Sequence, residues 1–193
     1  SEMCIRDRYI AGPLSLAIVI LSGFFVIIEF SLMGARRHRL EETAESSAAS
    51  RAALRSLNEL TIMLAGAQLG ITAATFALGA ITKPWIHHML MPVFAAVGIS
   101  GGLADTIAFV VALLLVTFVH LVVGEMAPKS WAIAHPELAV RIIALPARGF
   151  IWVFRPLLKW INVIANKLVA ATGVQPVDRT GAQGYDTNTL RTL

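Results

Sequence analysis

The chain alternates between long apolar stretches and short charged ones, and the apolar stretches have the length of membrane-spanning helices. Four stretches contain no Asp, Glu, Lys or Arg: residues 9–28, 60–82, 84–104 and 106–124. A helix needs about 20 apolar residues to cross the hydrocarbon core of a bilayer. The first, second and fourth stretches therefore predict three spanning helices.

Residues 84–104 are less regular than the other three stretches. They contain the polar pair His87-His88, and they are interrupted by Pro84, Pro92, Gly98, Gly101 and Gly102. Proline and glycine mark turns and helix ends more strongly than any other residues. This stretch therefore predicts a short helix, a turn and a loop, as a re-entrant or outer-surface segment rather than a fourth span.

Composition places the chain among membrane proteins. It is 56% hydrophobic and 15% charged, with a mean hydropathy of +0.71, whereas soluble domains are about 25% charged. The pI is about 9.7, but the net charge is only +4 and the basic residues form no continuous patch, so nucleic-acid binding is not expected. The single cysteine, Cys4, excludes a disulfide framework. No hydrolase, phosphate-loop or zinc-protease motif is present, so the chain is not expected to be an enzyme.

Basic residues predict the orientation in the membrane. The segment after the first span begins Arg36-Arg37-His38-Arg39, and Lys and Arg are enriched in cytoplasmic loops. With three spans, the basic segment after residue 128 falls on the same side. The prediction is a multi-pass protein of the inner or plasma membrane, with its N-terminus outside and its C-terminus in the cytoplasm.

Two segments on the predicted cytoplasmic side have helical character, residues 36–59 and 138–172. In the second, basic residues recur between aromatic ones, which is typical of juxtamembrane helices that lie along the lipid surface. Pro146 and Pro156 are expected to break this segment into pieces.

The alternative for the second segment is a fourth span from about Phe150 onward. That alternative is disfavoured because Arg155 and Lys159 would lie deep in lipid. Residues 1–8 carry four charges and match nothing downstream, so we interpret them as a non-native or disordered tail. The predicted fold class is an all-α membrane protein, with three spans, one short outer helix and cytoplasmic juxtamembrane helices.

Two carboxylates in or next to the spans, Glu29 and Glu125, are candidates for function because ionisable groups in a membrane are costly. Glu125 follows Gly124 and precedes Pro128 and Lys129. Pro128 cannot donate a hydrogen bond to the carbonyl of Gly124. A carboxylate beside a freed carbonyl oxygen suits Mg²⁺, Ca²⁺ or Na⁺. The alternative is that both carboxylates lie at the inner headgroup level and pair with Arg or Lys.

The second span carries oxygen donors on one helical face. Gln68, Thr72 and Thr75 follow the i, i+4, i+7 spacing, with Gly79 beyond them. This face predicts a polar lining at a close helix contact. The alternative is that these small and hydroxyl side chains serve only packing between membrane helices.

Three more positions could take part. Ser31 and Gly34 follow Glu29 and would supply a further oxygen from the first span. His120 lies on the approach to Glu125, as a core hydrogen-bonding residue or a proton carrier.

Three sequence blocks together resemble the transmembrane domain of the CNNM/CorC family of magnesium transport proteins. They are FFVIIEFSLMGARRHRL at residues 24–40, AQLGITAATFALGAITKP at 67–84 and VTFVHLVVGEMAPKSWAIAHPE at 116–137. The resemblance implies three spans, belt-like juxtamembrane helices and a homodimer in the lipid bilayer. It assigns residues 9–175 to the transmembrane domain and residues 176–193 to the start of a cytoplasmic linker, with a CBS-pair module expected beyond the chain end.

The resemblance also implies a function and a ligand set. The function is Mg²⁺ export by alternating access, coupled to Na⁺ entry. The ligands would be Glu125, Thr75 and the region of Ser31 and Gly34, with the backbone at Gly124; Thr75 stands where the family commonly has Asn. The alternative function is a non-transporting dimeric anchor for a cytoplasmic sensor module, which would tolerate loss of the Glu125 charge.

Overall fold

The computed structural model describes residues 2–99 and 101–173, with side chains from residue 9 onward, and these residues form helices without any strand. The chain divides into two compact units. The first unit comprises Ser1–Ile27 and Gln68–Ala134, and the second comprises Ile28–Ala67 and His135–Leu193. Two long helices, α1 (Glu2–Gly34) and α4 (Leu60–Ala77), each contribute residues to both units.

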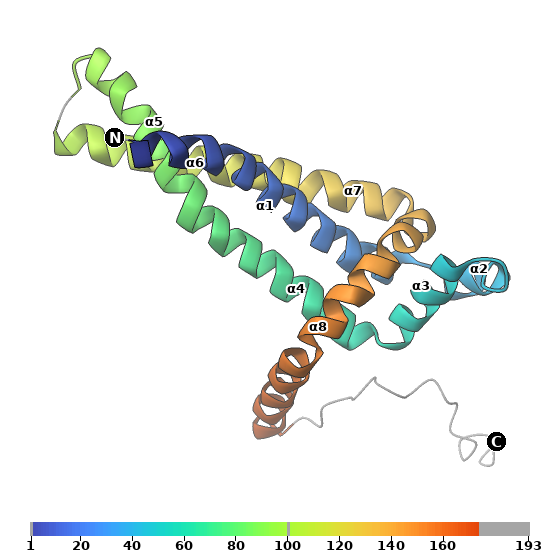
Figure 1. The fold of residues 1–193 in the computed structure, drawn as a ribbon. Helices are drawn as coiled ribbons and strands as arrows, with labels where there is room; N and C mark the ends of the chain where they lie inside the picture. The colour runs from blue at the N-terminus through green and yellow to red at the C-terminus, as the bar shows by residue number, and fades with distance from the viewer. Residues whose placement is uncertain (1, 100, 174–193) are drawn as a thin grey trace, which may run out of the picture. The chain divides into compact units, whose positions relative to one another are not determined.

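Three helical segments of the described residues are long and apolar enough to cross a membrane, which confirms the predicted number of spans. They are Tyr9–Gly34, Leu60–Ala96 and Gly102–Ala134. The first lies within the single helix α1, whereas the second and third each join two α-helices through a short segment of π-helix. Figure 1 shows them as the long helices that carry the labels α1, α4 and α6.

The second span continues without a break into the stretch with the many prolines and glycines. Helix α4 passes through the π-helix η1 (Leu78–Thr82) into α5 (Lys83–Ala96). The expected short helix and turn are therefore confirmed, although the short helix is joined to the second span. Gly98 has a φ of +84°, a conformation that side chains disfavour, and this residue turns the chain after α5. Whether α5 is re-entrant or lies at the outer surface stays a prediction.

The third span has the same composite construction. Helix α6 (Gly102–Val119) continues through the π-helix η2 (His120–Met126) into α7 (Ala127–Ala134). Each π-helix ends two residues before a proline, Pro84 in one case and Pro128 in the other. A proline offers no N–H and crowds the carbonyl four residues earlier, and the wider π turn accommodates both changes.

The core of the first unit lies where α1, α4, η1 and α6 meet. Its buried members are Ile18, Val19, Ala74, Leu78 and Val116. Helices α5 and α6 pack as a hairpin (Figure 1). Large apolar side chains such as Phe109, Leu114 and Phe118 remain uncovered on α6, as expected for a surface that faces lipid.

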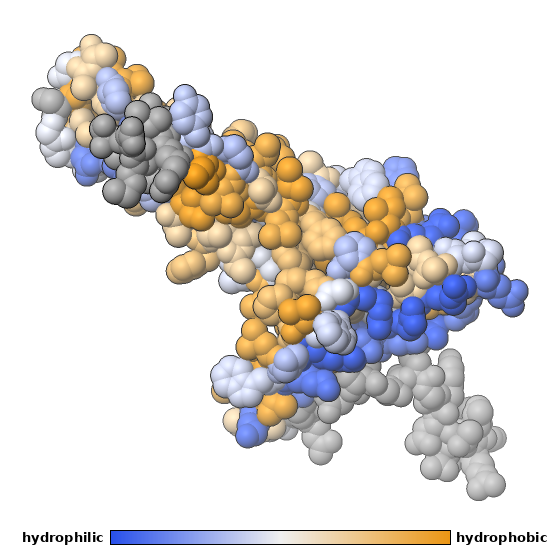
Figure 2. All heavy atoms as spheres, in the orientation of Figure 1, coloured by the Kyte–Doolittle hydropathy of each residue, from blue (hydrophilic) through white to orange (hydrophobic). Residues whose placement is uncertain are grey.

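The second unit contains α2 (Arg37–Glu42), α3 (Ala48–Asn58) and α8 (Pro136–Ala171). These helices confirm the helical character predicted for residues 36–59. Helix α3 packs on α8 through fully buried alanines, including Ala52, Ala53, Ala139 and Ala147. Hydrophilic residues gather over α2 and α3, where the sequence is rich in Arg and Glu (Figure 2).

Helix α8 corrects one expectation. Pro146 and Pro156 do not break it, since a single helix runs from Pro136 to Ala171. Both prolines lie on the exposed side of the helix, so neither the missing backbone hydrogen bond nor the proline ring disturbs the buried face. Helix α8 is not among the candidate spans, which agrees with the interfacial interpretation.

The two ends of the chain complete the comparison with the sequence. Helix α1 begins at Glu2, and the interpretation of residues 1–8 as a non-native or disordered tail stays a prediction. The expected linker of residues 176–193 lies outside the described residues.

Candidate functional site

Glu125 lies inside the π-helix η2, in the first unit. The N–H of Ala127 bonds to the carbonyl of Val122, five residues earlier, as π geometry requires. The next residue, Pro128, has no N–H to offer, so the carbonyl of Gly124 loses its ordinary helical donor. The Glu125 side chain is 32% exposed. The carboxylate predicted to be functional thus lies in a segment of π-helix, a distortion that is frequent at functional sites.

Two glycines bring other groups close to Glu125. A Cβ on Gly124 would lie 2.7 Å from Cδ2 of His120, so the missing side chain leaves room for the imidazole ring. A Cβ on Gly23 of α1 would lie 3.0 Å from Cγ of Pro128 and 3.8 Å from the carbonyl oxygen of Gly124. Gly23 therefore allows helix α1 to approach Pro128 and the backbone of η2 closely.

A buried polar group lies beside Glu125. Oγ of Ser22 is 2.9 Å from Nε2 of His120, and the same nitrogen is 3.9 Å from Oε1 of Glu125. Ser22 is fully buried and His120 is 7% exposed. The structure thus confirms His120 as a buried hydrogen-bonding residue. The sequence pattern missed Ser22, whose only signal was a hydroxyl group in an otherwise apolar stretch, seven residues after Ser15.

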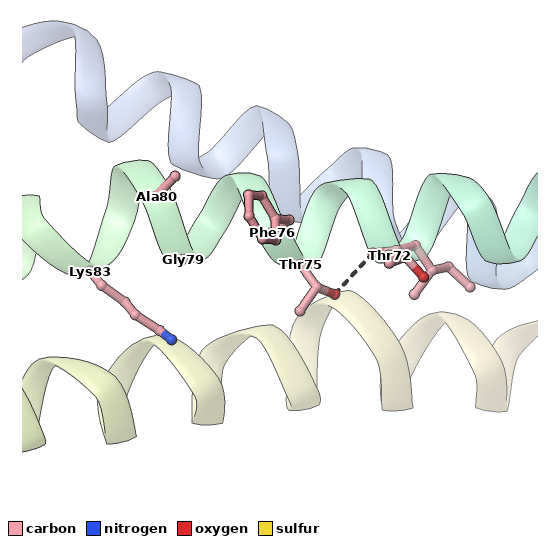
Figure 3. A pocket seen from close by; sticks show the side chains of 7 residues that line it. Thr72, Thr75, Phe76, Gly79, Ala80 and Lys83 are labelled. Atoms are coloured by element: carbon pink, nitrogen blue, oxygen red, sulfur yellow. Dashed lines mark hydrogen bonds between the residues drawn. The ribbon is translucent and has the colours of Figure 1, made fainter.

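The polar face of the second span lies elsewhere in the first unit. Thr72 and Thr75 line an open pocket of about 660 Å³, together with Ile71, Phe76, Gly79, Ala80 and Lys83. Figure 3 shows Thr75 and Lys83 pointing to the same side of the helix. The Thr75 hydroxyl donates to the carbonyl of Ile71 at 2.9 Å. Glu125 and Gln68 do not line this pocket, although Gln68 is exposed on the same helix.

The first-span candidates belong to the second unit, which begins at Ile28. Ser31 is fully buried, and its hydroxyl donates to the carbonyl of Ile28 at 3.4 Å. A Cβ on Gly34 would lie 3.2 Å from Cβ of Pro136, so Gly34 allows the start of α8 to approach α1. Glu29 is partly buried. A joint ligand set of Ser31, Gly34, Glu125 and Thr75 stays a prediction, because its members belong to different units.

The donor set decides which metals suit the site. Among the described residues, no three His, Cys, Asp or Glu side chains gather at a potential metal site. A cation at Glu125 would therefore rely on one carboxylate, with hydroxyl and carbonyl oxygens completing its shell. Such oxygen donors, with retained water, suit Mg²⁺ better than a soft metal. Lys129, in α7, is partly buried four residues after Glu125.

Comparison with known proteins identifies relatives for nearly the whole chain. The family model for the CNNM "Cyclin M transmembrane N-terminal domain" matches residues 13–193. The chain is 35% identical over 173 residues to "Uncharacterized protein Rv1841c" of Mycobacterium tuberculosis, covering 89% of this chain and 49% of that protein. It is 34% identical over 160 residues to "UPF0053 protein YhdT" of Bacillus subtilis, covering 82% of this chain and 35% of that protein. The chain thus spans half or less of the length of these relatives.

Proposed function

Because the chain belongs to the CNNM family, as its cyclin M transmembrane N-terminal domain, we propose that it is the membrane domain of a Mg²⁺ transport protein. Family membership and three membrane-spanning segments support a membrane domain of divalent-cation transport proteins. The observation that carries the proposal is Glu125, a carboxylate in a π-helix within the third span, next to the carbonyl of Gly124, to which Pro128 cannot donate a hydrogen bond. A carboxylate at such a position is costly unless it serves a cation or a partner.

In this proposal the cargo binds at Glu125 while it keeps part of its hydration shell. Mg²⁺ demands near-octahedral geometry and gives up water reluctantly, so one carboxylate and a few fixed oxygens are enough for a transient site. The Gly124 carbonyl is the nearest additional donor along the chain. Thr75, Ser31 and Gly34 would contribute in other conformations of an alternating-access cycle. Na⁺ entry is the proposed driving reaction, and a homodimer in the lipid bilayer is the proposed assembly.

A non-transporting anchor is the second candidate, and one observation favours it. The pocket lined by Thr72, Thr75 and Phe76 is open to the surroundings. The Thr75 hydroxyl already donates its hydrogen to a carbonyl of its own helix. This face would therefore suit contact with another helix as well as it suits an ion path. In that case Glu125 would have no ion to bind.

The deciding experiment measures the thermal unfolding of the full 193-residue chain in detergent during a Mg²⁺ titration. Wild type, Glu125→Gln and Asp105→Asn are compared, and Na⁺ at matched ionic strength controls for screening. Asp105 is the matched control because its carboxylate belongs to the same unit, is 64% exposed and lies 3.0 Å from Nε2 of His87.

Saturable stabilisation by Mg²⁺ is expected in wild type and in Asp105→Asn, and its loss is expected in Glu125→Gln, because a ligand that binds the folded state raises stability. Flux of Mg²⁺ into liposomes would then test transport directly. Equal stabilisation of Glu125→Gln and wild type, or none in either, would refute a cation site at Glu125 and favour the anchor.

A further inference from the structure

Two arginines of helix α8 share a single carboxylate in the second unit. Nη2 of Arg155 donates a 2.8 Å hydrogen bond to Oε1 of Glu59, and Nη1 of Arg148 lies 3.8 Å from Oε2 of the same side chain. The two arginines are seven residues apart, so they lie on one face of α8. These three residues form the arginine cluster. Within it, two positive charges face one negative charge, so one positive charge is left over.

Glu59 does not satisfy all the donors of the two guanidinium groups. Among the described residues, Nη1 of Arg148 and Nε of Arg155 are buried and have no hydrogen-bond partner. A guanidinium group carries five N–H donors, and a buried charged donor without an acceptor is costly. The two side chains as a whole are 28% and 38% exposed, so the cluster lies at the edge of the unit. A small rotation of either side chain would bring its unused donor to an external acceptor.

The arginine cluster lies at one end of the second span. Glu59 directly precedes Leu60, the first residue of α4 and of the membrane-spanning segment Leu60–Ala96. The first turns of α4 also pack on α8, because a Cβ on Gly66 would collide with Cδ1 of Ile151. Residues that flank the hydrocarbon stretch of a span lie at the level of the lipid head groups. The cluster is therefore expected at the depth of the lipid phosphates.

Exposed apolar side chains flank Arg155 along α8. Trp152, Leu157 and Trp160 are 76%, 41% and 63% exposed. Tryptophan is enriched where head groups meet acyl chains, and apolar side chains of interfacial helices enter that boundary. A free phosphate ion would gain nothing from these neighbours. A lipid, in contrast, brings a phosphate group and acyl chains to the same place.

We propose that Arg148 and Arg155 bind a phosphate group at the membrane surface, and that this group belongs to an anionic lipid. Planar guanidinium groups match the oxygens of a phosphate and donate to them in pairs. Basic pockets beside membrane spans bind the head groups of anionic lipids in this way. Glu59 holds the two arginines side by side and competes with the phosphate for their donors. None of these residues belongs to the proposed cation site, so the inference does not depend on Mg²⁺ transport.

The test follows the thermal unfolding of the full 193-residue chain in a non-ionic detergent while phosphatidylglycerol is added to the micelles. Saturable stabilisation is expected, because a ligand that binds the folded state raises stability. Phosphatidylcholine, whose choline group cancels the charge of its phosphate, should stabilise less. A parallel titration compares inorganic phosphate with chloride at matched ionic strength. Stabilisation by inorganic phosphate without any effect of phosphatidylglycerol would overturn the lipid as the source of the phosphate group.

Arginine variants locate the site on α8. Arg148→Gln and Arg155→Gln should each raise the fraction of phosphatidylglycerol at half-maximal stabilisation about fivefold, the loss expected for one basic residue at an anionic lipid surface. Arg141→Gln is the matched control and should have a smaller effect. Arg141 lies on the same helix seven residues before Arg148, but its Nε donates to the carbonyl of Glu137 at 3.2 Å. An equal effect of Arg141→Gln would overturn the proposal.

Glu59→Gln separates lipid binding from a purely structural role of the cluster, and it serves even if the arginine variants fail to fold. The variant removes the competing carboxylate, so the half-maximal fraction of phosphatidylglycerol should fall, although the protein without lipid becomes slightly less stable. Glu137→Gln changes the net charge equally on α8 and should shift this fraction less. An unchanged or higher fraction in Glu59→Gln, or no effect of phosphatidylglycerol on wild type, would overturn the proposal.

Discussion

Substitution of Gly70 by Ala tests how closely α1 and α4 are packed in the first unit. A Cβ on Gly70 would lie 2.5 Å from three ring atoms of Phe25, whereas ordinary contact begins at 3.4 Å. The ring or the backbone must therefore move by about 0.9 Å. Phe25 is 3% exposed, so it has little room to give. Overpacking of this kind costs about 1–3 kcal/mol, and the better helix propensity of Ala offsets about 1 kcal/mol of that.

The expected net loss of stability in Gly70→Ala is up to about 2 kcal/mol, which corresponds to a fall in the unfolding midpoint of up to about 8 °C for a chain of this size. The assay is thermal unfolding in detergent, followed by size-exclusion chromatography of the protein that stays folded. Gly79→Ala is the matched control in the same span, because its Cβ would meet only Nζ of Lys83, at 3.9 Å. Its midpoint should not fall.

A double variant shows whether the loss arises at the named contact. Phe25→Leu removes the ring atoms that the new Cβ would meet, so adding Gly70→Ala to Phe25→Leu should cost less than adding it to wild type. The reasoning would be refuted if the midpoint of Gly70→Ala were as high as that of Gly79→Ala, or if the cost of Gly70→Ala were the same with and without the Phe25 ring.

Two further predictions concern the second unit. Gly149 lies within α8, and a Cβ there would meet nothing within 4 Å. Gly149→Ala should therefore stabilise the protein by about 0.5–1 kcal/mol, because Ala favours the helix more than Gly does. An unchanged or lower thermal midpoint would contradict this prediction. Glu59 accepts a 2.8 Å hydrogen bond from Arg155 and lies 3.8 Å from Arg148. Because all three side chains are about one-third exposed, Glu59→Gln should lower the stability of the protein by about 1 kcal/mol or less at low salt. The difference in thermal midpoint between this variant and wild type should shrink in high salt. A difference that does not depend on salt would show that charge is not its cause.

The number and approximate position of the spans could be predicted because that signal is local. A membrane excludes unpaired backbone groups, so about 20 residues without charge have few structures available other than a helix. The stretches at 9–28, 60–82 and 106–124 all became spans, each extended by neighbouring helical turns. The turn near Gly98 was also readable, because its positive φ favours the one residue without a side chain.

The shape of α8 could not be read in the same way. Proline weakens a helix, and the local rule predicts breaks at Pro146 and Pro156. Burial of the opposite face, from Ala139 to Leu158, outweighs that weakness and holds one helix together. Glu59 likewise pairs with Arg155 across 96 residues of sequence, a partner that no local pattern indicates.

The sequence by itself determined the membrane class, the three spans and the local setting of Glu125, which lies between Gly124 and Pro128. Only the tertiary structure decided what surrounds that carboxylate. Ser22 and His120 are 98 residues apart, and their contact depends on how two helices rotate and cross. The propensity of single residues does not predict that crossing, because the packing of many side chains at once sets the angle between the helices.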